Sequence, residues 1–219
     1  MALVIFDCDG VLVDSEIIAH ELLAQMMTEL GHPMTTAESI ERFGGRSLTD
    51  TLALIEGILG RKVPADLGER YGRRLAEHLR RDLKPVAGVK AAVAALPYRH
   101  CVGSSSSFAR IRLSLEVTGL APLFGDNIFS ATQVAHGKPA PDLYLLAART
   151  MDAAPGHCVV VEDSPLGVQA AVAAGMAAIG FTGAGHATAD LAQALATAGA
   201  RRVLAAMPEL PATVAELLG

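Results

Sequence analysis

The sequence predicts an α/β fold, in which a parallel β-sheet core carries helices on both faces and a small helical bundle is inserted into the chain. Short apolar runs recur along the sequence, and helical stretches opened or closed by Pro, Gly or Ser lie between most of them. The runs are continuously apolar, which is typical of parallel strands buried on both faces. One connection, unlike the others, is very long and carries helical periodicity without a convincing strand.

Five strands are predicted, over residues 3–6, 101–103, 127–129, 158–161 and 177–181. The connections between the later strands are long enough to be crossover helices, as parallel pairing requires. The helix after the fourth strand has clear boundary signals, because Ser164 can cap it, Pro165 suits its first turn and Gly175 can end it. These elements form a βαβ pattern.

Residues 15–85 interrupt this pattern with four predicted helices, over 16–30, 37–43, 47–59 and 64–83. Four short helices can close a bundle of their own. We therefore expect two domains, an α/β core of residues 1–14 and 86–219 and a helical cap domain of residues 15–85.

Composition excludes several classes of function. The chain has 219 residues, of which 51% are hydrophobic, enough for one good core and a smaller second unit. Its net charge of −5 and the lack of any Lys/Arg-rich block argue against a nucleic-acid partner. No segment reaches the ~20 apolar residues of a membrane span, and the N-terminal apolar run is too short for a signal peptide. We expect a cytoplasmic protein with no membrane partner, either a monomer or a weak homo-oligomer.

The three cysteines, Cys8, Cys101 and Cys158, are odd in number and have no metal-binding spacing. Two of them lie in apolar strand-like runs, where a reduced thiol packs as a small hydrophobic group. A disulfide framework is therefore not expected.

Polar residues gather directly after the predicted strands and before one helix. Ligands of open α/β sheets bind outside the carboxyl ends of the strands, so these residues are candidates for one site. Each one alone is explained by a turn, a helix cap or a solvated charge. Together they supply a nucleophile, hydroxyl donors, a cation and carboxylates for a metal, which is the set that phosphoryl transfer needs. They are Asp7, Asp9, Ser104, Ser105, Lys138, Glu162 and Asp163.

Four motifs in this order resemble the haloacid dehalogenase (HAD) superfamily. They are DCDGVLVDS at 7–15, Ser104 after the second strand, Lys138 in GKPAPD, and Glu162-Asp163 in VEDSPLG. The resemblance covers essentially the whole chain and lies in the β-phosphoglucomutase-like and sugar-phosphatase branch, whose helical cap follows the first strand. It implies a Rossmann-like core and a small phosphorylated metabolite as substrate.

The resemblance also implies roles for individual residues. Asp7 would be the nucleophile that forms an aspartyl-phosphate, Asp9 the general acid and base, and Lys138 the cation that neutralises developing charge. A carboxylate that attacks a phosphate dianion meets like-charge repulsion, which Mg²⁺ relieves. The metal ligands would be Asp7, the backbone carbonyl of Asp9, and Asp163, with Glu162 binding either directly or through water.

Further residues are expected to contact the substrate. The Ser104 hydroxyl and the Ser105 amide, at the start of the next helix, would bind the phosphoryl oxygens. Gly45 and Arg46, in the cap loop 43–47, would contact the part of the substrate remote from phosphorus.

The resemblance leaves a choice between phosphatase and phosphomutase. The mutases carry a cap-helix histidine where this chain has Ala19, and a cap-loop arginine where it has Ser47; His20 and Arg46 are each displaced by one residue. Both departures favour a hydrolase. Of the seven histidines, we expect only His20 and His136 to lie near the site.

A more distant alternative is a phospho-receiver signalling domain. It shares the parallel sheet, an acceptor Asp, acidic metal ligands and a Lys. It has no helical insert after the first strand, and its acceptor lies on a later strand than its acidic pair.

Overall fold

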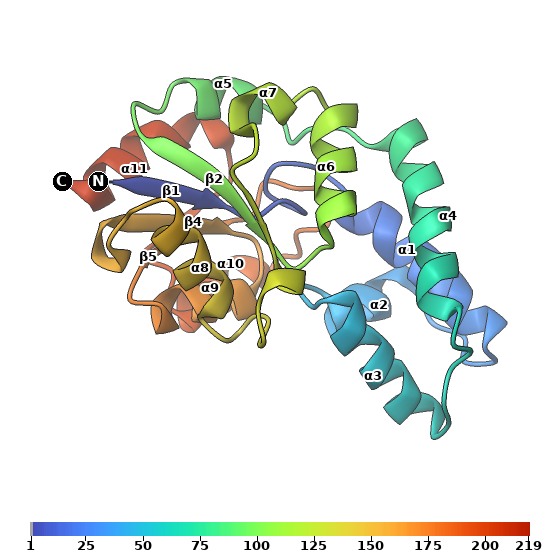
Figure 1. Cartoon of the computed structure of the whole chain (residues 1–219). Helices are drawn as coiled ribbons and strands as arrows, with labels where there is room; N and C mark the ends of the chain where they lie inside the picture. Colours follow the sequence, from blue (N-terminus) through green and yellow to red (C-terminus); the bar gives the residue numbers. More distant parts are fainter. Residues whose placement is uncertain (1) are drawn as a thin grey trace.

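The computed structural model describes residues 2–219, and its centre is a six-stranded parallel sheet with the strand order β3-β2-β1-β4-β5-β6 (Figure 1). The chain starts in the middle of the sheet, where β1 is paired in parallel with both β2 and β4. The strands are β1 (Leu3–Phe6), β2 (Arg99–Ser104), β3 (Ile128–Ser130), β4 (Cys158–Glu162), β5 (Ala177–Phe181) and β6 (Arg202–Leu204).

Helices cover both faces of the sheet because alternate strand residues point to opposite faces. Val4 and Phe6 join one apolar cluster, whereas Leu3 and Ile5 join the other. The first face packs against α5 (Val89–Ala94), α6 (Phe108–Val117), α7 (Ala121–Phe124) and α11 (Leu210–Leu218). The second face packs against α8 (Asp142–Thr150), α9 (Pro165–Ala173) and α10 (Leu191–Ala198). Short 3₁₀ turns complete the connections at η1 (Ala131–Gln133), η2 (Pro155–His157) and η3 (Met207–Glu209).

The long connection after β1 holds the four helices that the sequence predicts. They are α1 (Glu16–Glu29), α2 (Thr36–Phe43), α3 (Leu48–Leu59) and α4 (Leu67–Asp82). In α4 the buried residues Leu67, Tyr71, Leu75 and Leu79 recur every fourth position, so one apolar stripe faces the other helices. These four helices lie to one side of the sheet, beyond the carboxyl ends of its central strands (Figure 1).

The chain leaves and re-enters the sheet part of the molecule at adjacent points. The Asp14 amide donates to the Lys84 carbonyl at 3.0 Å, and the Val86 amide donates to the Leu12 carbonyl at 3.0 Å. The two segments that connect helices α1–α4 to the sheet therefore lie side by side, as a hinge between two domains requires. We keep the division into a core of residues 1–14 and 86–219 and a cap of residues 15–85 as a proposal.

The fold class and all five predicted strands are confirmed, and the sheet has one strand more. Strand β6 has three residues and begins with the exposed Arg202, so it contains only two residues of the apolar run 203–207, and Ala205 and Ala206, which follow, form a bend. Within residues 2–219 no helix combines the length and the apolar character needed to cross a bilayer. Cys8, Cys101 and Cys158 are buried free thiols, as expected.

Candidate active site

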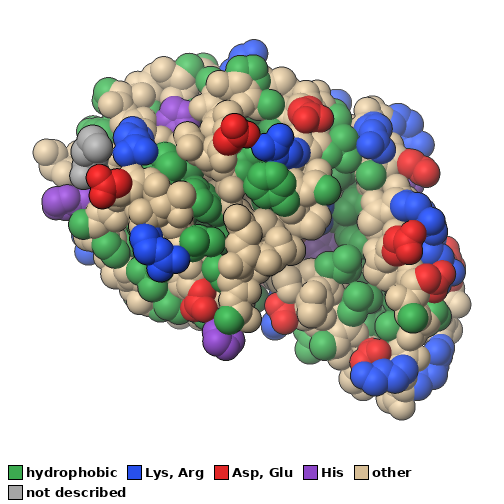
Figure 2. Space-filling view, viewed as in Figure 1, with side chains coloured by type: hydrophobic (Ala, Val, Ile, Leu, Met, Phe, Trp, Pro, Cys, Tyr) green, Lys and Arg blue, Asp and Glu red, His purple; other side chains and the backbone are tan. Residues whose placement is uncertain are grey.

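A cavity of about 630 Å³ lies between the carboxyl edge of the sheet and helices α1–α4. Figure 2 shows the hollow between the two parts of the molecule. Both parts supply lining residues. The sheet side contributes Asp7, Asp9, Ser104, Ser105, Arg110 and Asp163; the helical side contributes Glu16, His20, Phe43, Gly45, Arg46 and Tyr71. The cavity therefore gathers most of the site residues that the sequence predicts.

Asp7 follows β1 directly and is paired with Lys138. The Lys138 Nζ lies 3.1 Å from Asp7 Oδ1, and both side chains are almost fully buried. The Asp7 Oδ1 atom has no hydrogen bond of good geometry in the described structure. Burial raises the pKa of the Asp7 carboxyl well above its ordinary range, although the charge of Lys138 opposes the shift. The ion pair with Lys138 therefore offsets only part of the cost of burying the Asp7 carboxylate.

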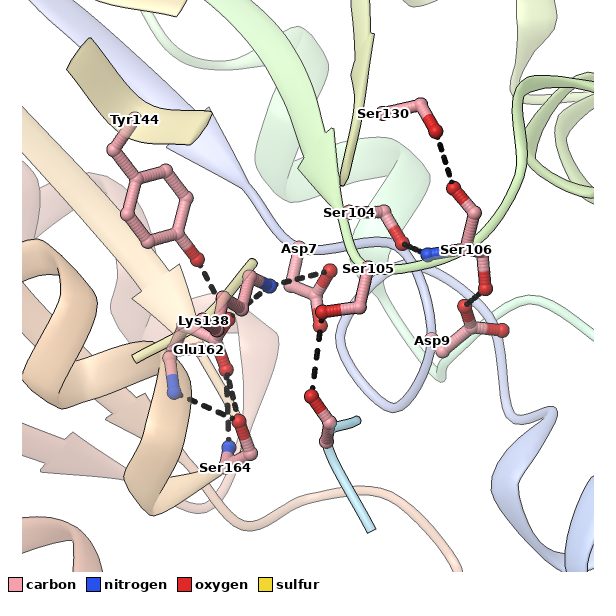
Figure 3. A network of polar contacts seen from close by, with 12 residues as sticks. Asp7, Asp9, Ser104, Ser105, Ser106, Ser130, Lys138, Tyr144, Glu162 and Ser164 are labelled. Carbon is pink, nitrogen blue, oxygen red and sulfur yellow. Dashed lines mark hydrogen bonds and ion pairs between the residues drawn. The ribbon is translucent and has the colours of Figure 1, made fainter. Parts of the chain in front are cut away.

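Glu162, the last residue of β4, binds Lys138 from the other side (Figure 3). Its Oε1 accepts hydrogen bonds from Lys138 Nζ and, at 2.6 Å, from the Tyr144 hydroxyl. Its Oε2 accepts from the amide and hydroxyl of Ser164, at 3.1 and 2.9 Å. Burial lowers the pKa of Lys138, but the charges of Asp7 and Glu162 outweigh burial and hold the pKa well above its usual value. Lys138 is therefore a fixed cation beside Asp7.

Asp163 lies next to His186, which no sequence motif assigns to the site. The Nε2 atom of His186 is 3.0 Å from Asp163 Oδ2, and both side chains are buried. The expectation that only His20 and His136 lie near the site is therefore wrong. The loop after β5 carries His186, and β5 is paired with β4, which ends beside Asp163. Burial raises the pKa of Asp163 to about 6, against the effect of His186.

The acidic residues could hold a divalent cation. Ligand atoms of Asp7, Glu162 and Asp163 lie within 4.8 Å of one another, and all three residues are buried. An all-oxygen set suits a hard cation such as Mg²⁺, and Asp7 Oδ1, which is ion-paired with Lys138 but accepts no hydrogen bond, can offer a ligand atom. Gly10, at φ +74°, leaves the space, because a Cβ there would lie 1.7 Å from Asp163 Oδ2. The residues present fit the metal that the family resemblance implies.

The Asp9 carboxylate is held by three donors, Ser15, Ser106 and Arg110. Ser15 Oγ and Arg110 Nη2 donate to Oδ1 at 2.5 and 2.6 Å, and Ser106 Oγ donates to Oδ2 at 2.6 Å. Arg110 lies on α6, where no motif marks it. It meets Asp9 because β2 is paired with β1, so that the residues after both strands lie together.

The serine run after β2 forms a bend before the next helix begins. Helix α6 begins at Phe108 with Ser107 as its N-cap, so the expectation that Ser105 starts this helix is wrong. Ser104 is the buried end of β2, and its hydroxyl accepts from the Ser106 amide at 3.1 Å. The Ser105 hydroxyl donates to the Gly45 carbonyl at 3.2 Å, and this contact joins the loop after α2 to the sheet side of the cavity.

The two histidines expected near the site differ in their surroundings. His20 lines the cavity, but its ring contacts Ser39 Oγ at 2.8 Å and Glu16 Oε2 at 3.1 Å. Burial raises the pKa of Glu16, but the hydrogen bond and charge of His20 lower it to about 2. His136 is exposed and lies 3.2 Å from Asp142. Only His20 belongs to the cavity wall.

Comparison with known proteins identifies the class of protein that this site and fold define. A model of the haloacid dehalogenase-like hydrolase family matches residues 1–175. The chain belongs to this family of hydrolases. Asp7, directly after β1, and the acidic pair Glu162-Asp163, at the end of β4, therefore lie in a member of a hydrolase family.

Individual relatives are similar along most of the chain. The 6-phosphogluconate phosphatase of Escherichia coli (strain K12) is 31% identical over 186 residues, covering 84% of this chain and 83% of that protein. The beta-phosphoglucomutase of Bacillus subtilis (strain 168) is 29% identical over 205 residues, covering 82% and 83%. A crystal structure of a haloacid dehalogenase-like protein from Agrobacterium tumefaciens str. C58 is 40% identical, with a TM-score of 0.86 and full coverage of both chains.

Proposed function

We propose that the protein is a Mg²⁺-dependent phosphatase that hydrolyses a small phosphorylated metabolite, a sugar or sugar-acid phosphate monoester, through an aspartyl-phosphate on Asp7. The observation that carries the proposal is the buried Asp7 Oδ1, which lies 3.1 Å from Lys138 at the wall of a 630 Å³ cavity. A buried carboxylate oxygen that accepts no hydrogen bond costs stability, and an active site is where such a cost is retained. The free thiols support a reducing compartment such as the cytoplasm.

Asp7, Asp163 and the Asp9 backbone carbonyl would hold the metal. When bound, Mg²⁺ reduces the repulsion between the Asp7 carboxylate and the phosphate dianion. Both oxygens of Glu162 already accept hydrogen bonds from protein groups, which favours a water-mediated role for this residue.

The residues then divide the reaction between them. An Asp7 oxygen attacks phosphorus while the bond to the substrate oxygen breaks, and that oxygen takes a proton from Asp9. Asp9 next removes a proton from water, and the water oxygen attacks phosphorus and releases Asp7 and inorganic phosphate. Lys138 neutralises the developing negative charge, while Ser104 and the Ser105 amide bind phosphoryl oxygens. Gly45 and Arg46 would contact the remote part of the substrate.

A phosphomutase is the second candidate, because one relative is named beta-phosphoglucomutase. Its cycle would transfer the phosphoryl group from Asp7 to a second hydroxyl rather than to water. His20 is engaged by Ser39 and Glu16 on both ring nitrogens, which argues against a free role for it in sugar transfer. A phospho-receiver domain is less well supported. Such a domain is phosphorylated once and needs no substrate cavity, whereas here four helices line a cavity over the carboxyl edge of the sheet.

A trapping experiment tests the proposal. Asp7→Asn removes the nucleophile, so turnover and covalent labelling should both disappear. Asp9→Asn keeps the nucleophile but cannot activate water, so turnover should fall by about 10²–10⁴-fold. With acetyl phosphate and Mg²⁺, this variant should accumulate one phosphoryl group on Asp7, detected by mass spectrometry after acid quench. EDTA should abolish hydrolysis, and added Mg²⁺ should restore it.

The contrary results are distinct. A label mapped to Ser104 or to a histidine would remove Asp7 from its role, as would turnover by Asp7→Asn. Transfer of phosphate within a sugar bisphosphate without release of inorganic phosphate would establish the mutase. Labelling of Asp7 without turnover of any ester would indicate the receiver.

A further inference from the structure

Arg110 is the one arginine that the sheet side contributes to the cavity wall, within residues 2–219, and none of the proposed chemical steps uses it. Its side chain is only 21% exposed. A guanidinium has five N–H donors and keeps its charge at any ordinary pH. Each N–H group of this largely buried side chain needs a hydrogen-bond acceptor.

The protein satisfies only part of the Arg110 guanidinium. Its Nη2 donates to Asp9 Oδ1 at 2.6 Å. Within residues 2–219 the buried Nε has no acceptor, and Nη1 donates no hydrogen bond. Unsatisfied donors at a cavity wall favour a ligand that supplies acceptors.

The one acceptor that Arg110 has is shared with other donors. Asp9 also accepts from Ser15 and Ser106, so its carboxylate stays hydrogen-bonded if Arg110 moves away. The carboxylate of Glu16 lines the same cavity, but its Oε2 contacts His20. Arg110 can therefore turn to a new anion without leaving a buried carboxylate of Asp9 unpaired.

The helical side of the cavity carries further arginines, and unlike Arg110 two of them, Arg46 and Arg80, form no ion pair within residues 2–219. Arg46 lies in the loop after α2. The first phosphate of a substrate would lie at Asp7 and Lys138. Arg110 contacts Asp9, which would face the leaving oxygen, and Arg46 lines the same cavity, so both arginines suit a second negative charge on the part of the substrate beyond that oxygen.

We propose that Arg110 is a specificity-determining residue, which passes from Asp9 to a second anionic group of the substrate, a carboxylate or a further phosphate, when the substrate binds. This inference rests on the proposed phosphatase activity and names the substrate class. A planar guanidinium binds either group through two parallel hydrogen bonds. Departure of Arg110 also frees one side of the Asp9 carboxylate for the leaving oxygen.

Three open-chain substrates distinguish the sources of the second anion. Sorbitol 6-phosphate has none, 6-phosphogluconate replaces its terminal CH₂OH with a carboxylate, and glucitol 1,6-bisphosphate replaces it with a phosphate ester. With Mg²⁺ present, the wild-type protein should prefer at least one of the two doubly anionic substrates, 6-phosphogluconate or glucitol 1,6-bisphosphate. Its kcat/KM for that substrate should be at least about tenfold above its kcat/KM for sorbitol 6-phosphate. The better of the two identifies the group that Arg110 binds.

Arg110→Met should bring that kcat/KM ratio close to one, mainly through KM of the doubly anionic substrate. Any loss caused by disturbing Asp9 affects all substrates alike and cancels in the ratio. Arg110→Lys, which keeps the charge but loses the two-pronged geometry, should retain part of the preference. The matched control is Arg112→Met on the same helix, because Arg112 is an exposed residue 2.8 Å from Asp126. Its ratio should equal that of the wild type.

Several outcomes would overturn the inference. A wild-type protein without preference among the three substrates would do so even if the Arg110 variants failed to fold. An unchanged ratio in folded Arg110→Met, checked by thermal unfolding, would do the same. In both cases phosphate is still released and the proposed phosphatase stands, whereas no release from any phosphate ester would remove the proposed function itself.

Discussion

The Nζ atom of Lys138 lies 3.1 Å from Oδ1 of Asp7, and it also donates to Glu162 on its other side. Two buried carboxylates thus share one buried cation. This arrangement fixes the position of the charge before a substrate arrives, which is how an active site stabilises charge at low reorganisation cost. It also makes the site sensitive to the loss of the lysine.

Lys138→Met should lower kcat by about 10²–10³-fold, because a fixed cation at developing charge contributes about that much. The metal-free variant should also be destabilised by about 3–5 kcal/mol, since Asp7 and Glu162 lose the buried cation that they share. Phosphate release and urea unfolding measure the two effects. Lys62→Met is the control, because Lys62 is 89% exposed and its pair with Glu56 lies at the surface. If Lys138→Met and Lys62→Met had the same kcat and the same free energy of unfolding, Lys138 would not be the cation that neutralises charge at the site.

Gly10→Ala should weaken Mg²⁺ binding by about 10–100-fold, the range seen when groups that orient metal ligands are altered. The new Cβ would lie 1.7 Å from Asp163 Oδ2, and φ +74° disfavours any side chain. Isothermal titration with MgCl₂ measures the effect. Gly57→Ala in α3 meets open space, so its Mg²⁺ affinity should not change, and its helix should gain roughly 0.5–1 kcal/mol. Unchanged Mg²⁺ affinity in Gly10→Ala would show that Asp163 does not bind the metal.

The metal-free protein should lose stability as the pH rises from about 4 to about 6. Burial raises the pKa of Asp163 from 3.8 to about 6 in the folded chain, so the native state binds more protons than the unfolded state in this window. The free energy of unfolding therefore falls with rising pH, by up to about 3 kcal/mol from this group. Asp7, whose pKa is also raised by burial, acts in the same direction.

Urea unfolding in EDTA across this pH range measures that slope. Asp163→Asn should flatten it, and Mg²⁺ should oppose it because the cation favours the ionised carboxylates. A slope of the opposite sign in the metal-free wild type would contradict the burial of these charges.

Arg46→Ala should lower kcat/KM for the best phosphorylated metabolite of a substrate screen at least about tenfold, because one charged hydrogen bond contributes about that much. The loss on p-nitrophenyl phosphate should be within about twofold, since that substrate lacks the polar remote part. Arg42→Ala, an exposed residue of α2 outside the cavity lining, serves as control. Equal losses on both substrates would show that Arg46 does not contact the remote group.

The sequence by itself determined the fold class, five of the strands and the four inserted helices. It also predicted that six polar residues lie close together, namely Asp7, Asp9, Ser104, Lys138, Glu162 and Asp163. These features are local, because apolar runs, helix periodicity and motifs such as DCDGVLVDS are legible within a few neighbouring positions. Carboxyl ends of parallel strands meet at one edge, so the motifs could also be assigned to one site.

Only the tertiary structure decided that Arg110 and His186 belong to this site, and that Ser105 contacts Gly45 across the cavity. Arg110 meets Asp9 because β2 lies beside β1, and His186 meets Asp163 because β5 lies beside β4. The order of strands in a sheet is set by packing over the whole chain, so contacts between side chains far apart in sequence carry no local pattern. The position of the short strand β6 at the edge of the sheet, beside β5, was decided in the same way.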